Sequence, residues 1–177
     1  GREEARLIYS GVAHTLPRMD GRRLVVDIGG GSTELIIGEG LEPIELESTQ
    51  MGCVSTTGQF FADGKVSAKR LARARVAARQ ELEPLQAAFR KCGWDQAVGS
   101  SGTVRAIGEA IRELRPGIGA ITPEGLELLL EALLGAVDAN SEIFQKSGVP
   151  SAGATGSVGK ASNASAAPLD LKVEKPV

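Results

Sequence analysis

The chain has 177 residues, of which 42% are hydrophobic and 24% are charged, as in an ordinary soluble globular domain. The formal net charge of −2 provides no global field to attract nucleic acid or an anionic membrane, and no segment has the roughly 20 apolar residues that span a bilayer. Cys53 and Cys92 stand far apart, unlike the ligands of a zinc site or the cysteines of a disulfide-rich secreted domain, so we expect a cytoplasmic protein.

The N-terminal part of the chain predicts a helix followed by a β-hairpin with a glycine tip. Apolar side chains at helical spacing predict a helix over 2–15. Residues 24–28 are typical of a buried strand, the three glycines at 29–31 force a tight turn, and 35–37 continue as a second apolar strand. Alternating apolar and acidic residues over 44–50 predict a third strand with one solvent-exposed face.

The second half of the chain predicts three helices and one strand. An amphipathic pattern over 67–91 predicts a long helix, which Pro84 should kink because proline removes a backbone donor. A short strand over 96–99, a Gly-Ser turn and a helix over 104–114 follow. A Thr-Pro pair then predicts the start of a last helix over 122–138.

The C-terminal segment is expected to be disordered. Residues 147–168 are almost entirely Ser, Gly, Ala, Val, Thr and Pro, which cannot bury enough apolar area to offset the entropy of ordering them. We therefore place a domain boundary near 138, with 139–177 as a divergent, disordered tail.

The glycine tip of the hairpin carries the strongest chemical signal in the sequence. Only glycine lets backbone N–H groups approach a phosphate closely, and nearby hydroxyls can add donors. Carboxylates on either side of the tip can hold Mg²⁺ beside a bound phosphate. The alternative, a plain hairpin with surface acids, is less favoured because three glycines without a role would weaken the sheet. The expected phosphate ligands are Gly29, Gly30, Gly31, Ser32 and Thr33, and the expected Mg²⁺ ligands are Asp27 and Glu34.

Four segments together resemble the Ppx/GppA phosphatase family. Residues 27–34 resemble its second phosphate loop, 1–7 resemble its catalytic-glutamate helix, and 99–103 resemble its later Gly-rich turn. Residues 51–54 resemble a family segment between them, and the resemblance ends near Leu134. The joint occurrence of these motifs is much more specific than any one of them.

The resemblance implies an α/β fold of the actin-like ATPase, ribonuclease-H-like type, in which two lobes close on a cleft. It implies Mg²⁺-assisted hydrolysis of the terminal phosphate of inorganic polyphosphate, or the related reaction on guanosine pentaphosphate. Residues 1–138 would be a partial domain that carries the second phosphate loop. In the family a glutamate on the first helix activates the attacking water, and here that role falls on Glu3 or Glu4.

Helical geometry favours Glu4 as this base. Glu4 should lie over Leu7 and Ile8 on the apolar stripe of the first helix, whereas Glu3 should point toward Arg6. An inward, partly buried carboxylate makes a better general base than a solvated one. The alternative is that both are solvated carboxylates favoured by the helix dipole.

The sequence also departs from the family pattern. In the family a first phosphate loop precedes the glutamate helix, and nothing before Gly1 supplies it here. We therefore expect a fragment that lacks the N-terminal lobe and is inactive by itself. We also expect the complete protein to be a homodimer. A non-catalytic phosphate- or nucleotide-binding module and a kinase-like relative on the same fold remain alternatives. The basic residues within 69–79 either hold polyphosphate or form a solvated helix face.

Overall fold

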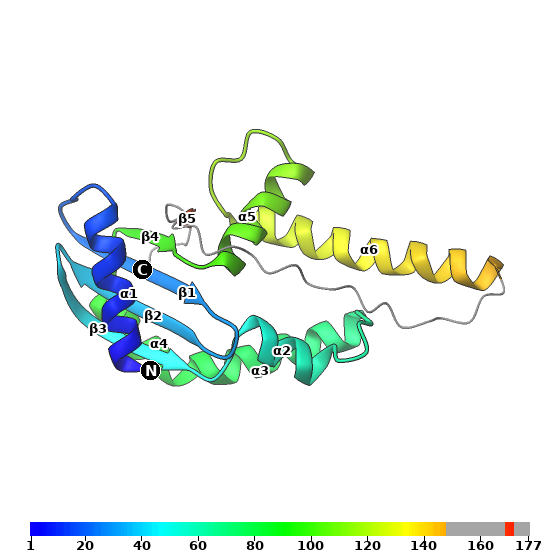
Figure 1. The fold of residues 1–177 in the computed structure, drawn as a ribbon, viewed down its shortest axis with the longest axis horizontal. Coiled ribbons are helices and arrows are strands. Elements are labelled where there is room, and N and C mark those ends of the chain that lie inside the picture. Colours follow the sequence, from blue (N-terminus) through cyan, green and yellow to red (C-terminus); the bar gives the residue numbers. More distant parts are fainter. Residues whose placement is uncertain (148–168, 172–177) are drawn as a thin grey trace.

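A computed structural model describes residues 1–147 and 169–171 of the chain, which form one five-stranded sheet with helices around it (Figure 1). The strands are β1 (Arg22–Ile28), β2 (Thr33–Glu39), β3 (Glu42–Thr49), β4 (Gln96–Gly99) and β5 (Leu169–Leu171). The helical segments are α1 (Arg2–Thr15), α2 (Cys53–Phe60), α3 (Ala68–Leu82), the 3-10 turn η1 (Glu83–Leu85), α4 (Gln86–Cys92), α5 (Gly102–Leu114) and α6 (Pro123–Ser147).

The sheet has the strand order β3-β2-β1-β4-β5. β1, β2 and β3 form an antiparallel meander, while β4 runs parallel to β1 and β5 runs antiparallel to β4. A parallel pair needs a crossover, and the segment from α2 to α4 provides it. A three-stranded meander whose first strand pairs in parallel with the fourth is the ribonuclease-H-like arrangement, so the expected fold class is confirmed.

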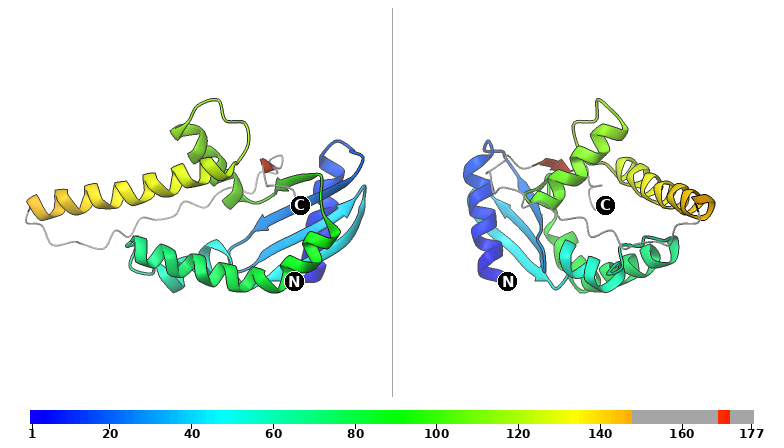
Figure 2. Two further views of the ribbon diagram at one scale, coloured as in Figure 1. Left: turned by 180° about the vertical axis from the view of Figure 1, so that it is seen from behind. Right: turned by 45° about the vertical axis from the view of Figure 1, so that its right-hand side comes forward.

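Helix α1 lies across one face of the sheet (Figures 1 and 2). Its Tyr9 is buried with Val25 of β1 and Ile36 of β2 in one core cluster. The ring lies against Gly38, where any side chain would collide with it, and the hydroxyl donates to the Gly40 carbonyl at 3.2 Å. This packing fixes the position of α1, and therefore of its acidic first turn, over the sheet.

The buried side of α1 differs in part from the predicted stripe. Ile8 is half-buried against the core, but Leu7, the other named residue of that stripe, is 58% exposed, while Ala5 and Val12 are buried. Tyr9 takes the central place instead, because its ring reaches the space that a glycine leaves open in β2. The side of the helix that faces the sheet is thus rotated away from Leu7.

The opposite face of the sheet is covered by the second half of the crossover. Phe89 of α4 packs with Leu24, Ile37 and Ala97 of the sheet. The predicted kink is confirmed, since a 3-10 turn that contains Pro84 separates α3 from α4. Beyond the sheet, α5 and α6 pack on each other through a third apolar cluster.

The last helix begins as predicted but ends later. Its N-cap is confirmed, because the Gly125 amide donates to Thr122 Oγ1 at 3.1 Å. The helix continues past Asp138 to Ser147, since the intervening residues include no proline or glycine and the next glycine is at 148. Residues 139–147 are therefore helical, contrary to the predicted disordered tail.

Helix α2 and strand β5 were not predicted from the sequence. Helix α2 is short and lacks a wide apolar stripe, with no buried side chain, so its periodicity is weak. Residues 169–171 lie inside the predicted disordered tail but form a strand on β4. The rest of that prediction, over 148–168 and 172–177, falls outside the described residues. No helix in the described part of the chain is long and apolar enough to cross a membrane.

Candidate active site

The predicted phosphate loop is the turn between β1 and β2. The Gly29 amide donates to the Ser32 carbonyl at 2.9 Å, which closes the turn. Within residues 1–147 and 169–171, the amides of Gly30, Gly31 and Ser32 have no hydrogen-bond partner. Consecutive free amides at a turn form a concave site for an anion. The amides of Gly30, Gly31 and Ser32 are therefore available to a phosphate, whereas the amide of Gly29, also a predicted ligand, is used within the turn.

Helix α2 orients these amides. The Gly29 carbonyl accepts a hydrogen bond from the Cys53 amide at 2.9 Å, and the Gly30 carbonyl accepts one from Val54 at 2.9 Å. In a trans peptide the C=O and the following N–H point in opposite directions. Because both carbonyls point at the N-terminus of α2, the amides of Gly30 and Gly31 must point away from it. The helix also gains partners for its first free donors.

A row of four polar side chains crosses the sheet beside this loop, and we call it the polar row: Ser48 of β3, Glu34 of β2, Asp27 of β1 and Ser100 after β4. Asp27 and Glu34 are directly opposite each other in the β1–β2 pair, and Glu34 is opposite Ser48 in the β2–β3 pair. Ser48 Oγ donates to Glu34 Oε1 at 2.8 Å, and Ser100 Oγ donates to Asp27 Oδ2. Opposite residues share one face of a sheet, so the two carboxylates face each other on the side that α1 covers.

The charges of the polar row act on one another. Burial raises the pKa of Asp27, the hydrogen bond from Ser100 opposes this increase, and the nearby carboxylates of Glu34 and Glu4 raise the pKa further. Glu34 is only 1% exposed. The charges of Glu34 and Glu4 thus both act on Asp27, and a cation beside Asp27 and Glu34 would relieve the repulsion between these two carboxylates.

The two candidate bases on α1 lie on different sides of the helix. Glu3 accepts a hydrogen bond from Arg6 at 2.7 Å, as predicted, and this contact holds the pKa of Glu3 below its ordinary value. Glu4 interacts with Asp27 and lies 3.4 Å from the Gly1 amino group. Its side chain is 60% exposed, so the predicted partial burial is wrong for this structure. The reason is that α1 turns its Tyr9 side, not its Leu7 side, to the sheet.

The start of α5 adjoins the same end of β1. Ser101 Oγ accepts hydrogen bonds from the amides of Ile28 and Val104, both at 3.2 Å. It therefore caps α5 and ties that helix to the residue that follows Asp27. The N-terminus of a helix carries partial positive charge, so this arrangement favours an anion near the phosphate loop.

Comparison with known proteins assigns these features to a family. The family model described as "Ppx/GppA phosphatase family" matches residues 1–147. The chain belongs to this family. The match extends past Leu134, where the resemblance was predicted to end, and includes all of α6.

This chain is similar to individual members of the Ppx/GppA family over part of their length. A Haemophilus influenzae protein named as an exopolyphosphatase is 47% identical over 136 residues, which are 77% of this chain and 42% of the relative. A guanosine-5'-triphosphate,3'-diphosphate pyrophosphatase of Vibrio vulnificus is 53% identical over 109 residues, which are 62% of this chain and 22% of the relative. The chain thus spans less than half the length of these two relatives.

Solved structures of the family show the same fold. The Aquifex aeolicus Ppx/GppA protein matches with a TM-score of 0.52 and 30% identity over 67% of this chain and 37% of its own. An exopolyphosphatase from Cytophaga hutchinsonii matches with a TM-score of 0.53 and 31% identity over 67% of this chain and 38% of its own. The family fold expected from the sequence is confirmed by these similarities.

Two predicted phosphate ligands of this Ppx/GppA chain are used elsewhere: the Gly29 amide closes the turn, and the Thr33 side chain is buried. Thr33 is 4% exposed, and its Oγ1 donates to the Met51 carbonyl at 2.7 Å. It is adjacent in sequence to Glu34 in β2, so its side chain lies on the other face of the sheet. Its hydroxyl is therefore not the free donor that we predicted. Ser32 is half-exposed at the tip and makes no side-chain hydrogen bond within the described residues.

The site includes residues that sequence reasoning missed. Ser48 and Ser100 complete the polar row, and Gly52 allows α2 to approach the loop. The alternation of β3 could have indicated Ser48, since it falls in register with Glu34. Ser100 lay within the recognised Gly-rich turn, but only the pairing of β1 with β4 brings it to Asp27.

The acidic groups fit a Mg²⁺ ion that also binds phosphate and water. Among the described residues, no group of three His, Cys, Asp or Glu side chains could hold a metal ion by itself. Mg²⁺ commonly uses one or two carboxylates and completes its coordination with waters and substrate phosphates. Asp27 and Glu34 are suited to such a shared site.

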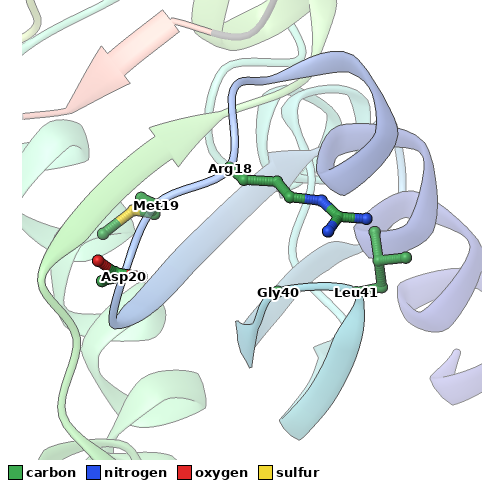
Figure 3. A pocket seen from close by; sticks show the side chains of 5 residues that line it. All are labelled: Arg18, Met19, Asp20, Gly40 and Leu41. Carbon is green, nitrogen blue, oxygen red and sulfur yellow. The ribbon is translucent and has the colours of Figure 1, made fainter.

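A separate pocket lies at the other end of the sheet (Figure 3). It is lined by the connection between α1 and β1 and by the turn after β2, with Arg18 reaching toward Leu41 above Gly40. Met19 and Asp20 form the opposite side of this pocket. The pocket contains no predicted site residue, because it borders the far end of β2 from the phosphate loop.

Replacing Gly52 should disturb the phosphate loop. A Cβ added there would lie 2.6 Å from the Gly31 nitrogen and would also collide with the Gly30 carbonyl. We expect Gly52→Ala to cost about 1–3 kcal/mol of stability, as overpacking of a close contact does, and to weaken phosphate binding by moving the loop. Urea unfolding and phosphate titration of the whole protein would measure both effects.

Gly58→Ala, within the helix that Gly52 precedes, provides the matched control. An added Cβ at Gly58 meets nothing within 4 Å, and the change should stabilise α2 by about 0.5–1 kcal/mol because alanine is the better helix former. Equal behaviour of the two variants would contradict the close contact between α2 and the loop.

Proposed function

We propose that the protein to which this chain belongs hydrolyses the terminal phosphate of inorganic polyphosphate with the help of Mg²⁺. The observation that carries this proposal is the combination of free loop amides with two facing carboxylates on adjacent strands. Phosphoryl transfer is catalysed mainly by positioning and by charge stabilisation, and these groups are suited to both.

In this proposal each part of the site has a separate role. The amides of Gly30, Gly31 and Ser32 bind the terminal phosphate, with the positive end of α5 nearby. Asp27 and Glu34 hold Mg²⁺, which neutralises phosphate charge when bound. Glu4 orients the attacking water and accepts its proton. Two observations support this role: the Glu4 side chain is exposed to water, and its charge is near enough to Asp27 to act on that carboxyl.

Guanosine pentaphosphate is the alternative substrate, because family relatives with both names match the chain. The match to the protein named as an exopolyphosphatase covers more of this chain, 77% against 62%, and supports polyphosphate as the first choice. The helix α3 also exposes basic residues that suit a long polyanion, although its Arg70 pairs with Asp63. A non-catalytic phosphate-binding module is a further alternative.

The setting of this activity is also part of the proposal. We propose that the complete protein is a cytoplasmic homodimer. In each subunit an N-terminal lobe would close over the phosphate loop and supply further phosphate ligands. The free thiols of Cys53 and Cys92 are in keeping with a reducing compartment. The relatives' greater length leaves room for such a lobe.

Phosphate release by the purified whole protein tests the proposal. We expect Mg²⁺-dependent release from polyphosphate that exceeds release from guanosine pentaphosphate, whereas the opposite preference would favour the alternative substrate. Binding of polyphosphate without release would favour the non-catalytic module. The 177-residue chain alone should release none, because one phosphate loop cannot surround the reacting group. Activity restored by adding the separately produced N-terminal lobe would support this reason, and robust turnover by the chain alone would contradict it.

A further inference from the structure

The two serines of the polar row have no role in the mechanism proposed above. Ser100 donates to Oδ2 of Asp27, and Ser48 donates to Oε1 of Glu34. Each facing carboxylate therefore has a serine on its outer side. The residues that the structure describes offer no hydrogen-bond partner to Asp27 Oδ1 or to Glu34 Oε2.

The backbone holds both serines in place. The Ser100 amide donates to the Val26 carbonyl at 3.0 Å, which ties the start of the turn to β1. The preceding Gly99 packs so closely on Val104 that an added Cβ would lie 3.0 Å from the valine Cβ. At the other end of the row, Ser48 is fixed by the register of β3 against β2. The two hydroxyls are thus presented from rigid positions on opposite sides of the carboxylates.

A hydroxyl in this position restricts the carboxylate that it contacts. The terminal torsion of an Asp or Glu side chain is broad, so an unrestrained carboxylate rotates freely. Asp27 and Glu34 carry like charges on one face of the sheet, and repulsion would turn their oxygens apart. A fixed donor on one oxygen defines the orientation of the other. The hydroxyls therefore oppose the rotation that repulsion favours.

We infer that Ser100 and Ser48 are positioning residues that each hold one oxygen of a carboxylate, so that the second oxygens of Asp27 and Glu34 remain available to one divalent cation. The inference rests on the proposed function, because it assigns a purpose to the same two carboxylates. It adds that cation affinity depends on side chains that do not themselves bind the cation.

Cation binding without substrate tests this inference on the whole protein. Free Mn²⁺ can be followed by electron paramagnetic resonance and serves as the probe for the Mg²⁺ site. We expect Ser100→Ala to weaken Mn²⁺ binding about 10- to 100-fold, the usual effect of removing a partner that orients a ligand. Ser100→Thr keeps the hydroxyl and should restore binding, and Ser48→Ala should weaken it in the same direction.

A control and a second readout separate positioning from general damage. Ser10→Ala removes a hydroxyl on α1 that makes no side-chain hydrogen bond within the described residues, so it should leave Mn²⁺ binding unchanged. In steady-state assays, Ser100→Ala should raise the Mg²⁺ concentration for half-activation and change the rate at saturating Mg²⁺ much less. If Ser100→Ala fails to fold by circular dichroism, Ser48→Ala and Ser100→Thr carry the test.

The outcomes distinguish this inference from the proposed function. Mn²⁺ affinity that is unchanged in Ser100→Ala and Ser48→Ala overturns the inference, even if the protein hydrolyses polyphosphate. Weakened binding in both variants supports it, even if neither substrate is hydrolysed and the proposed function fails. Absence of Mn²⁺ binding by the unmodified protein overturns it together with the proposed metal site.

Discussion

Replacing Asp27 with asparagine should lower Mg²⁺-dependent phosphate release by the whole protein about a hundredfold or more. A bound metal contributes several kcal/mol of charge stabilisation in the transition state, and each 1.4 kcal/mol corresponds to tenfold in rate. The asparagine side chain would keep the shape of Asp27 and could still accept the hydrogen bond from Ser100. It would lack the charge that holds the cation. Phosphate release measured against Mg²⁺ concentration would show this loss.

The same substitution should stabilise the fold at neutral pH. The pKa of Asp27 is raised in the folded state, chiefly by burial, above its ordinary value of 3.8. The protonated form therefore favours folding, and its contribution is complete below 3.8 and is lost as the pH rises through the raised pKa. Asparagine stays neutral at every pH. Thermal unfolding should show that Asp27→Asn gains more stability over the unmodified protein at pH 7 than at pH 3.

Asp20→Asn provides a control for this comparison, because Asp20 is an exposed acid at the far end of the sheet. It should leave the Mg²⁺ response unchanged. Unaltered Mg²⁺ activation in Asp27→Asn would remove Asp27 from the metal site. Such a result would also weaken the case for Glu34, which is placed there by its pairing with Asp27.

Replacing Glu4 with glutamine should lower turnover by about 10²- to 10⁴-fold, the usual cost of losing a positioned general base. Substrate affinity should change little, because the loop amides bind the phosphate in our proposal. Glu4 is preferred to Glu3 because its charge acts on Asp27, whereas Glu3 is engaged by Arg6. Steady-state kinetics with polyphosphate would separate the effect on kcat from that on KM.

Glu3→Gln is the matched control, since it removes the neighbouring carboxylate and breaks only an exposed ion pair with Arg6. Exposed pairs of this kind contribute little to stability because water and salt screen them, so the variant should fold and turn over nearly normally. Greater damage from Glu3→Gln than from Glu4→Gln would assign the base to Glu3 and refute the orientation of α1 used here.

Sequence by itself determined the parts of the molecule that depend on neighbouring residues. The hairpin with its glycine tip, the break at Pro84 and the Thr122 cap all follow from local backbone preferences, and the structure confirms them. The facing acids could also be predicted, because Asp27 and Glu34 lie at equal distances from the tip of one hairpin. Such features need no knowledge of distant contacts.

The tertiary structure alone decided how the rest of the site is assembled. Ser100 reaches Asp27 only because β4 pairs in parallel with β1 after a long crossover, and sequence periodicity does not specify that register. The burial of the Thr33 hydroxyl depends on the segment before α2, and the exposure of Glu4 depends on Tyr9 filling the space over Gly38. Each of these outcomes is set by packing between segments far apart in the chain, where side-chain volume and strand register, rather than local preference, determine which groups meet.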